Sequence, residues 1–235
     1  MPSEETEREP GHPAAERLDD LKQSFEAAMK PRLRGWLHFG AGPLAFLLGL
    51  GLLVVTPEQN LRLAVAVYVA TTVLLFGVSA SYHLGAGGAR TSAFLNRLDH
   101  ANIYLFIAGS YTPYAAALND RQTGTTMLAL VWSIAVIGLI VRVLWWQAPR
   151  WLVVGSYLAL GWVSLFFLPA IWEQFGPAVV SLLALGGVLY SIGGVVYARQ
   201  KPNPSPDWFG HHELFHAFTI AAFLAQYTAI AMAVS

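Results

Sequence analysis

Seven long apolar runs, separated by short turn-forming or charged stretches, dominate this sequence. Each run is close to the roughly 20 residues that an α-helix needs to cross a hydrocarbon core. The runs span 36–55, 62–83, 99–118, 125–145, 151–170, 178–198 and 211–234. The 235-residue chain is 55% hydrophobic and 12% charged, which is too little charge to cover a soluble protein of this size. We therefore predict an all-α membrane protein, with a seven-transmembrane helix bundle over residues 31–235.

The first 30 residues differ in composition from the rest of the chain. Eight of the 14 acidic residues lie within the first 26 positions. Residues 1–13 are rich in Glu and Pro and have almost nothing to bury, which predicts a disordered acidic tail. Over residues 14–30, apolar side chains recur at spacings of three and four, at Leu18, Leu21, Phe25 and Met29. This spacing predicts a short amphipathic helix that lies on the membrane or on the bundle.

Arginine and lysine indicate the orientation of the spans. If the N-terminus is cytoplasmic, the inner segments hold Lys30, Arg32, Arg34, Arg90, Arg97, Arg142, Arg150, Arg199 and Lys201. The outer loops then hold only Arg62 and Arg121. Because short loops with excess positive charge stay cytoplasmic, this bias predicts seven spans with the N-terminus inside and the C-terminus outside.

Composition also excludes several kinds of function. There is no broad basic patch, so nucleic acid is not an expected partner. The absence of cysteine excludes disulfides, thiolate ligands and a cysteine nucleophile. The oligomeric state is left open by the sequence.

Histidines and carboxylates within the predicted spans are few, and apart from His38 they gather at three places. His83 ends the second span, Asp99 and His100 open the third, and the hexapeptide HHELFH at 211–216 opens the seventh. With the predicted topology, all three places lie at the cytoplasmic end of the bundle. Because charges inside a membrane are costly and usually functional, we expect these side chains to converge on one site.

The seventh span begins with the spacing of a metal site. His212 and His216 are four residues apart, so on a helix their rings lie on one face. Imidazole is a common zinc ligand, and a catalytic zinc has three protein ligands and an open position for water. His83 is the natural third ligand. We therefore predict a zinc ion held by His83, His212 and His216, although iron, cobalt or nickel would also accept three imidazoles.

Two further residues are assigned to catalysis beside this ion. Ser79 lies four residues before His83 and could hydrogen-bond a bound water or a ligand's second nitrogen. Asp99 could hold and deprotonate the water, whose pKa the ion lowers. Each has a structural alternative, since serines pack between membrane helices and Asp99 could stabilise its helix start or pair with Arg97.

The remaining histidines of the spans are placed outside the ligand set. His38 is interpreted as a packed or interfacial histidine near the start of the first span. His100 and His211 point about 100° away from Asp99 and His212 around their helices, so they rank below the three chosen ligands.

The segment 212–216 also satisfies the H-E-x-x-H pattern of zinc proteases, with Glu213 as the would-be general base. The pattern is short. No Asp or Glu follows Glu213, so a third ligand must lie upstream. An intramembrane metalloprotease is therefore a disfavoured alternative.

Three stretches, taken in order, resemble a known family. They are SASYH at 79–83, the stretch from RLDH at 97–100 to IAGSYTP at 107–113, and HELFH at 212–216. Together they resemble the bacterial hemolysin III proteins, which belong with the progestin and adipoQ receptors, including the adiponectin receptors. The resemblance covers roughly residues 30–235.

This resemblance implies zinc near the cytoplasmic side of a seven-helix bundle in the bacterial inner membrane. The family's histidine ligands correspond to His83, His212 and His216, its aspartate to Asp99 and its motif serine to Ser79. Adiponectin receptors have been linked to hydrolysis of the amide bond of ceramide. We expect a zinc-dependent hydrolase that acts on an amide or ester bond of a lipid-like substrate, with membrane lipids as partners. The alternative is a non-enzymatic receptor, sensor or pore with a structural zinc.

Overall fold

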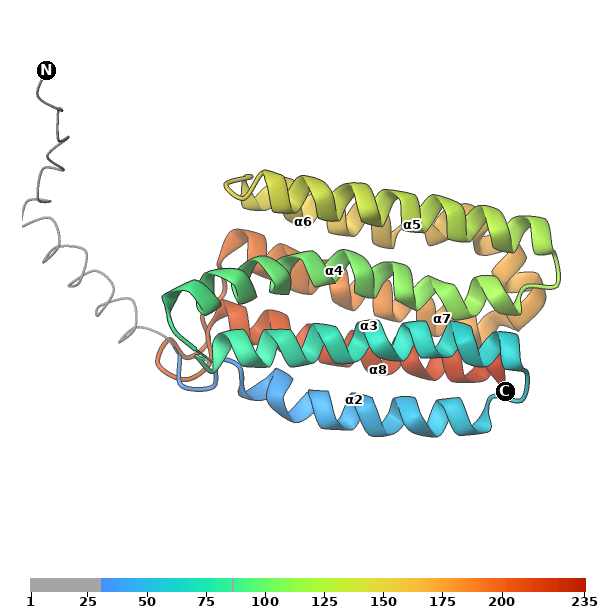
Figure 1. Cartoon of the computed structure of the whole chain (residues 1–235), viewed down its shortest axis with the longest axis horizontal. Helices are drawn as coiled ribbons and strands as arrows, with labels where there is room; N and C mark the ends of the chain where they lie inside the picture. Colours follow the sequence, from blue (N-terminus) through green and yellow to red (C-terminus); the bar gives the residue numbers. More distant parts are fainter. Residues whose placement is uncertain (1–30, 86) are drawn as a thin grey trace, which may run out of the picture.

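The computed structural model describes residues 31–85 and 87–235, and this part of the chain consists of α-helices packed side by side (Figure 1). The helices are α2 (Trp36–Val55), α3 (Gln59–His83), α4 (Ala89–Ala117), α5 (Arg121–Leu144), α6 (Arg150–Gly161), α7 (Ser164–Arg199) and α8 (His211–Val234). Within the described ranges the only β-type pairing is an isolated bridge between Ser205 and Phe209. The all-α prediction is confirmed. The predicted tail at 1–13 and amphipathic helix at 14–30 lie outside the described residues.

The helix bounds follow the apolar runs closely, with two differences. The runs at 36–55 and 211–234 coincide with α2 and α8. Helix α4 begins at Ala89, well before the predicted start at residue 99, because its polar first turns continue the helix beyond the apolar run. The predicted span 151–170 is interrupted, since α6 ends at Gly161 and α7 begins at Ser164.

A side chain from α4 occupies the interruption between α6 and α7. The hydroxyl of Tyr111 donates a hydrogen bond to the carbonyl of Gly161 and accepts one, at 2.8 Å, from the backbone N–H of Ser164. The last carbonyls and the first N–H groups of adjoining helices need partners from outside the helix. The buried Tyr111 side chain supplies both at this break.

Helix α7 is itself divided at Gly176. This residue has a φ of 77° and a ψ of −177°, a conformation that glycine adopts far more readily than other residues. Pro177 follows and has no backbone N–H to continue the helical hydrogen-bond ladder. The separation predicted between the runs 151–170 and 178–198 therefore lies here, and α7 consists of a short helix before Gly176 and a longer one after it.

Several helices are long and apolar enough to cross a membrane. By length and composition, five stretches of the described chain qualify: Trp36–Val55, Gln59–His83, Arg121–Leu144, Arg150–Arg199 and His211–Val234. Helix α4 is not among them, and its first half carries Asn96, Arg97 and Asp99. Large apolar side chains such as Val54 and Phe166, 80% and 81% exposed, cover the outside of the bundle. These are the helix lengths and the surface of an integral membrane protein.

The predicted ionisable groups lie at one end of the bundle, which we call the histidine end. There α3 finishes at His83 and α8 starts at His211. Figure 1 shows this end on the left, together with the starts of α2, α4 and α6, while the C-terminus lies at the opposite end. Helix α4 packs against α3, α5, α6 and α8, so it is the central element of the bundle.

Candidate metal centre

Three histidines from two helices come together at the histidine end. His83 is the last residue of α3, whereas His212 and His216 lie in the first turns of α8. One ligand nitrogen of each lies within 4.8 Å of the other two. The Nε2 atoms of His83 and His212, 129 positions apart in the chain, are separated by 3.1 Å. The structure thus brings together the three histidines that the sequence singled out.

The spacing of these nitrogens suits a shared cation. Zinc binds imidazole nitrogen at about 2.0–2.1 Å, so two nitrogens on one tetrahedral ion lie about 3.3 Å apart. The 3.1 Å separation of His83 and His212 is close to this value. His216 completes a set of three imidazoles, a donor set that zinc and other late transition metals accept.

Asp99 and Ser79 lie beside the cluster, as their positions in the sequence suggested. Asp99 Oδ2 is 3.8 Å from His83 Nε2, and the Asp99 side chain is 15% exposed. The buried Ser79 side chain interacts with the Asp99 carboxylate. Arg97, the alternative partner considered for Asp99, instead holds its guanidinium 5.5 Å from the centroid of the Trp146 ring.

Glu213 has structural partners for both of its carboxylate oxygens. Oε1 accepts a 2.8 Å hydrogen bond from Arg34 Nε, and Oε2 accepts a 2.8 Å bond from the backbone N–H of Gly210. Its side chain is fully buried, whereas that of Arg34 is 22% exposed. The Gly210 contact satisfies the backbone N–H of the N-cap residue of α8, as the glutamate of a capping box does. A residue engaged in this way is poorly placed to act as the general base of a metalloprotease.

His100 and His211 hydrogen-bond to residues outside the three-histidine cluster. The Nδ1 and Nε2 atoms of His100 lie 2.9 Å from the Asn96 carbonyl and 3.2 Å from the Tyr197 hydroxyl. The Nδ1 of His211 lies 3.0 Å from the side-chain oxygen of Asn203. Neither ring belongs to the group of three histidines whose nitrogens lie close together.

His38 packs directly on one of the three histidines. Its ring stacks face to face on His216, with centroids 3.7 Å apart and planes inclined by 10°, and meets the edge of Phe76 at 5.0 Å. It is 3% exposed, and neither ring nitrogen has a hydrogen-bond partner among the described residues. Because the two rings are stacked and nearly parallel, their nitrogen atoms do not point toward a common position. His38 is therefore packed, as interpreted, but the sequence did not show that it supports a ring of the cluster.

Gly35 fixes the chain against the end of α3. It has a φ of 87°, and a Cβ atom built on it would lie 2.9 Å from His83 Cβ. A residue with a side chain would be strained in this conformation and would displace His83. The approach of residue 35 to residue 83 was not visible in the sequence.

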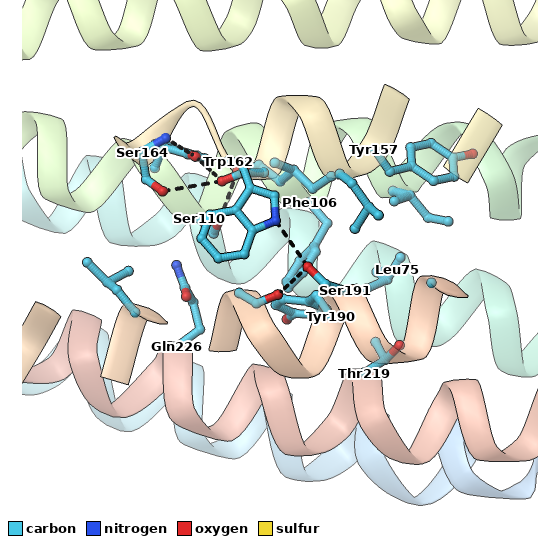
Figure 2. A pocket seen from close by; sticks show the side chains of 18 of the residues that line it. Leu75, Phe106, Ser110, Tyr157, Trp162, Ser164, Tyr190, Ser191, Thr219 and Gln226 are labelled. Atoms are coloured by element: carbon cyan, nitrogen blue, oxygen red, sulfur yellow. Dashed lines mark hydrogen bonds between the residues drawn. The ribbon is translucent and has the colours of Figure 1, made fainter. Parts of the chain in front are cut away.

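A cavity of about 220 Å³ leads from the histidines into the bundle. Asp99, His212 and His216 line its polar end, and Gln226 projects from α8 farther inside (Figure 2). In the same view the indole N–H of Trp162 donates a 3.0 Å hydrogen bond to Ser191. Most of the other lining residues are aliphatic or aromatic. The cavity therefore suits an apolar chain whose polar end lies at the histidines.

Comparisons with known proteins agree with the resemblance in the sequence. The family model described as haemolysin-III related matches residues 27–227. The chain is 31% identical over 138 residues to the hemolysin-3 homolog of Bacillus subtilis (strain 168), covering 59% of this chain and 62% of that protein. It is 28% identical over 159 residues to hemolysin-3 of Bacillus cereus, covering 67% and 68%.

A eukaryotic relative aligns over a longer stretch of this chain. Progestin and adipoQ receptor-like protein 1 of Caenorhabditis elegans is 28% identical over 215 residues, covering 82% of this chain and 49% of that protein. The chain thus spans less than two thirds of the Bacillus subtilis relative and about half of the Caenorhabditis elegans one. Because the family model extends over most of its length, the chain belongs to the haemolysin-III-related family.

Proposed function

We propose that this protein is a zinc-dependent membrane hydrolase that acts on an amide or ester bond of a lipid-like substrate. The observation that carries the proposal is the cluster of His83, His212 and His216 at the polar end of an otherwise apolar cavity. Asp99 and Ser79 stand beside the cluster. A zinc ion held by the three imidazoles would polarise the carbonyl of the scissile bond and activate water.

Two residues beside the ion would carry out the proton transfer and its positioning. Asp99 would accept a proton from the attacking water, and Ser79 would hold the carboxylate in place through its hydroxyl. The aliphatic and aromatic walls of the cavity would bind the substrate's hydrocarbon chain. Binding there would position the polar bond beside the imidazoles and exclude bulk water.

The proposal includes the topology of the chain in the membrane. We propose seven crossings, in which α6 and the part of α7 before Gly176 form one interrupted span and the rest of α7 forms the next. The break at Gly176 and the alternation of helix ends in Figure 1 support this division. The arginine bias supports a cytoplasmic N-terminus and a site near the cytoplasmic side. The proposed location is the bacterial cytoplasmic (inner) membrane, and the similarity to Bacillus proteins supports a bacterial membrane.

A receptor or sensor with a structural metal is the second candidate. It is favoured by relatives whose names denote receptors, including the adiponectin receptor protein of Drosophila melanogaster, 27% identical over 178 residues. A pore is less well supported, because the cavity walls beyond the histidines are mainly apolar. A protease is disfavoured by the structural partners of Glu213.

Metal content and lipid turnover of the same purified samples test the proposal. We expect the wild type to bind one zinc per chain and to hydrolyse fluorescent ceramide or ester lipids. His83→Ala and His212→Ala should lose zinc and turnover, whereas Asp99→Ala should keep zinc and lose turnover. Zinc without turnover of any lipid would favour the receptor, and full zinc occupancy after loss of all three histidines would eliminate the assigned ligands.

The stacked pair His38 and His216 provides a matched control. A phenylalanine at either position preserves an aromatic ring but removes both nitrogens. We expect His216→Phe to lose zinc and His38→Phe to retain it, because the His38 ring lies parallel to that of His216. Equal losses of zinc in the two variants would show that His38 is a ligand.

A further inference from the structure

A second cluster of charged residues lies at the histidine end, around Trp146 in the connection between α5 and α6. The guanidinium carbons of Arg97 and Arg142 lie 5.5 Å and 4.5 Å from the centroid of the Trp146 ring. Arg142 also donates a 2.8 Å hydrogen bond from Nη1 to the Trp146 carbonyl. Arg150 begins α6 four residues after Trp146. We call Arg97, Arg142, Trp146 and Arg150 the arginine cluster.

Among the residues that the structure describes, the positive charge of this cluster has no acidic counterpart. The salt bridges within the described ranges join Arg34 to Glu213 and His83 to Asp99, and none includes a member of the cluster. Arg142 is 8% exposed, and its buried Nε atom has no hydrogen-bond partner in the described part of the chain. A buried guanidinium with an unused donor is unfavourable unless an anion comes to it.

The orientation of the chain in the membrane does not fully explain why these arginines are present. Arginines at cytoplasmic helix ends help to orient a membrane protein, and exposed Arg199 is adequately explained in this way. An arginine that only orients the chain in the membrane does not need to be buried, whereas Arg142 is buried. The Trp146 ring face attracts cations, but it carries no net charge with which to neutralise three arginines.

We propose that the arginine cluster binds the phosphate of an anionic membrane lipid. Arginine matches phosphate geometry well, and basic pockets between transmembrane helices on the cytoplasmic side bind such headgroups. A lipid is favoured over a soluble phosphate because apolar surface adjoins the cluster: Leu144 is 80% exposed, Trp145 50% and Trp151 71%. Acyl chains can lie against this surface while the phosphate meets the guanidinium groups. This site does not depend on the metal or on the proposed hydrolase activity.

Native mass spectrometry of the detergent-solubilised protein tests the proposal. Phosphatidylglycerol and phosphatidylcholine are titrated separately, and the fraction of protein carrying one lipid is measured. We expect tighter binding of phosphatidylglycerol by the wild type. Each interfacial arginine contributes about a fivefold factor to anionic lipid affinity, so Arg97→Gln should weaken it about fivefold and Arg97→Gln with Arg150→Gln about 25-fold.

Control variants distinguish binding at the arginine cluster from the effects of net charge and of misfolding. Arg199→Gln removes one positive charge from an exposed position at the same end and should leave phosphatidylglycerol binding unchanged. Arg97 and Arg150 are also exposed, so their variants are expected to fold, as melting in phosphatidylcholine nanodiscs will show. Arg142→Lys keeps the charge but removes the planar guanidinium, and it should weaken binding without altering that of phosphatidylcholine.

Three results would overturn the proposal. The first is equal affinity for the two lipids. The second is an equal loss of phosphatidylglycerol binding in Arg199→Gln and Arg97→Gln, which would indicate a general charge effect. The third is that millimolar inorganic phosphate abolishes phosphatidylglycerol binding and raises the melting temperature of the protein as much as phosphatidylglycerol does. This result would identify a site for soluble phosphate.

Discussion

The ion pair between Arg34 and Glu213 leads to a prediction about stability: replacing both residues should lower the free energy of unfolding less than replacing Arg34 alone. Arg34 precedes α2 and Glu213 lies in the first turn of α8, with a 2.8 Å contact between them. The change to test is Arg34→Gln, alone and combined with Glu213→Gln. Arg34→Gln leaves a carboxylate in the bundle without its cation, whereas the double variant leaves no charge behind.

The burial of the two side chains sets the expected magnitudes. Removing one partner of a buried ion pair costs roughly 3–5 kcal/mol, and because Arg34 is 22% exposed we expect about 3 kcal/mol for Arg34→Gln. In the double variant a glutamine at position 213 can still accept the hydrogen bond from Gly210, so we expect a loss of about 1–2 kcal/mol. The double variant should therefore be more stable than Arg34→Gln by about 1–2 kcal/mol.

Equilibrium unfolding in mixed micelles of mild detergent and SDS, followed by tryptophan fluorescence, measures these differences. The single variant Glu213→Gln completes the double-mutant cycle and is expected to retain zinc. If the two single losses simply add in the double variant, the pair is not coupled and the reasoning is refuted. Loss of lipid turnover in a stable, zinc-loaded Glu213→Gln protein would instead support the protease-type role of this residue.

Two further predictions compare variants of the same residue type by their melting temperatures in detergent. Gly35→Ala should destabilise the protein by more than about 1 kcal/mol and weaken zinc binding, because its Cβ atom would lie 2.9 Å from His83 Cβ at a φ of 87°. Gly40→Ala, whose Cβ atom would meet nothing within 4 Å, should be neutral or slightly stabilising, and equal effects at the two positions would contradict this account. Tyr111→Phe should cost about 1–3 kcal/mol because the break between α6 and α7 loses its hydrogen bonds. Tyr190→Phe removes a hydroxyl with no hydrogen-bond partner in the described chain and should change the free energy of unfolding by less than about 0.5 kcal/mol. A larger loss of stability in Tyr190→Phe than in Tyr111→Phe would show that the Tyr111 hydrogen bonds do not stabilise the break.

The apolar runs were sufficient to predict most of the helices, because a helix that faces lipid must keep nearly all its residues apolar. The bounds of α2 and α8 followed directly from this pattern. The break after Gly161 did not, because the residues around it are as apolar as those of a continuous helix. It depends on a hydroxyl supplied by Tyr111, some 50 residues earlier, and a local pattern contains no information about such a contact.

The candidate site was predictable for a similar reason, since ionisable residues are rare in membrane spans and stand out there. His83 and His212 were identified in this way, and the structure places their nitrogens 3.1 Å apart. The supporting contacts were harder to predict. His38 was visible as a polar residue within a span, but the sequence did not indicate that its ring faces His216. Arg142 resembled any arginine at a helix end until its burial was known.

The contacts of α8 bear on how the protein is made. Arg34 and Glu213 are 179 residues apart, and α8 is the last of the described helices to leave the ribosome. A nascent chain that stops before α8 lacks the carboxylate that neutralises Arg34 and two of the three clustered imidazoles. The insertion of α8 therefore both supplies the partner of Arg34 and completes the three-histidine cluster. A cell that degrades chains without this ion pair would in the same step remove those that lack the cluster.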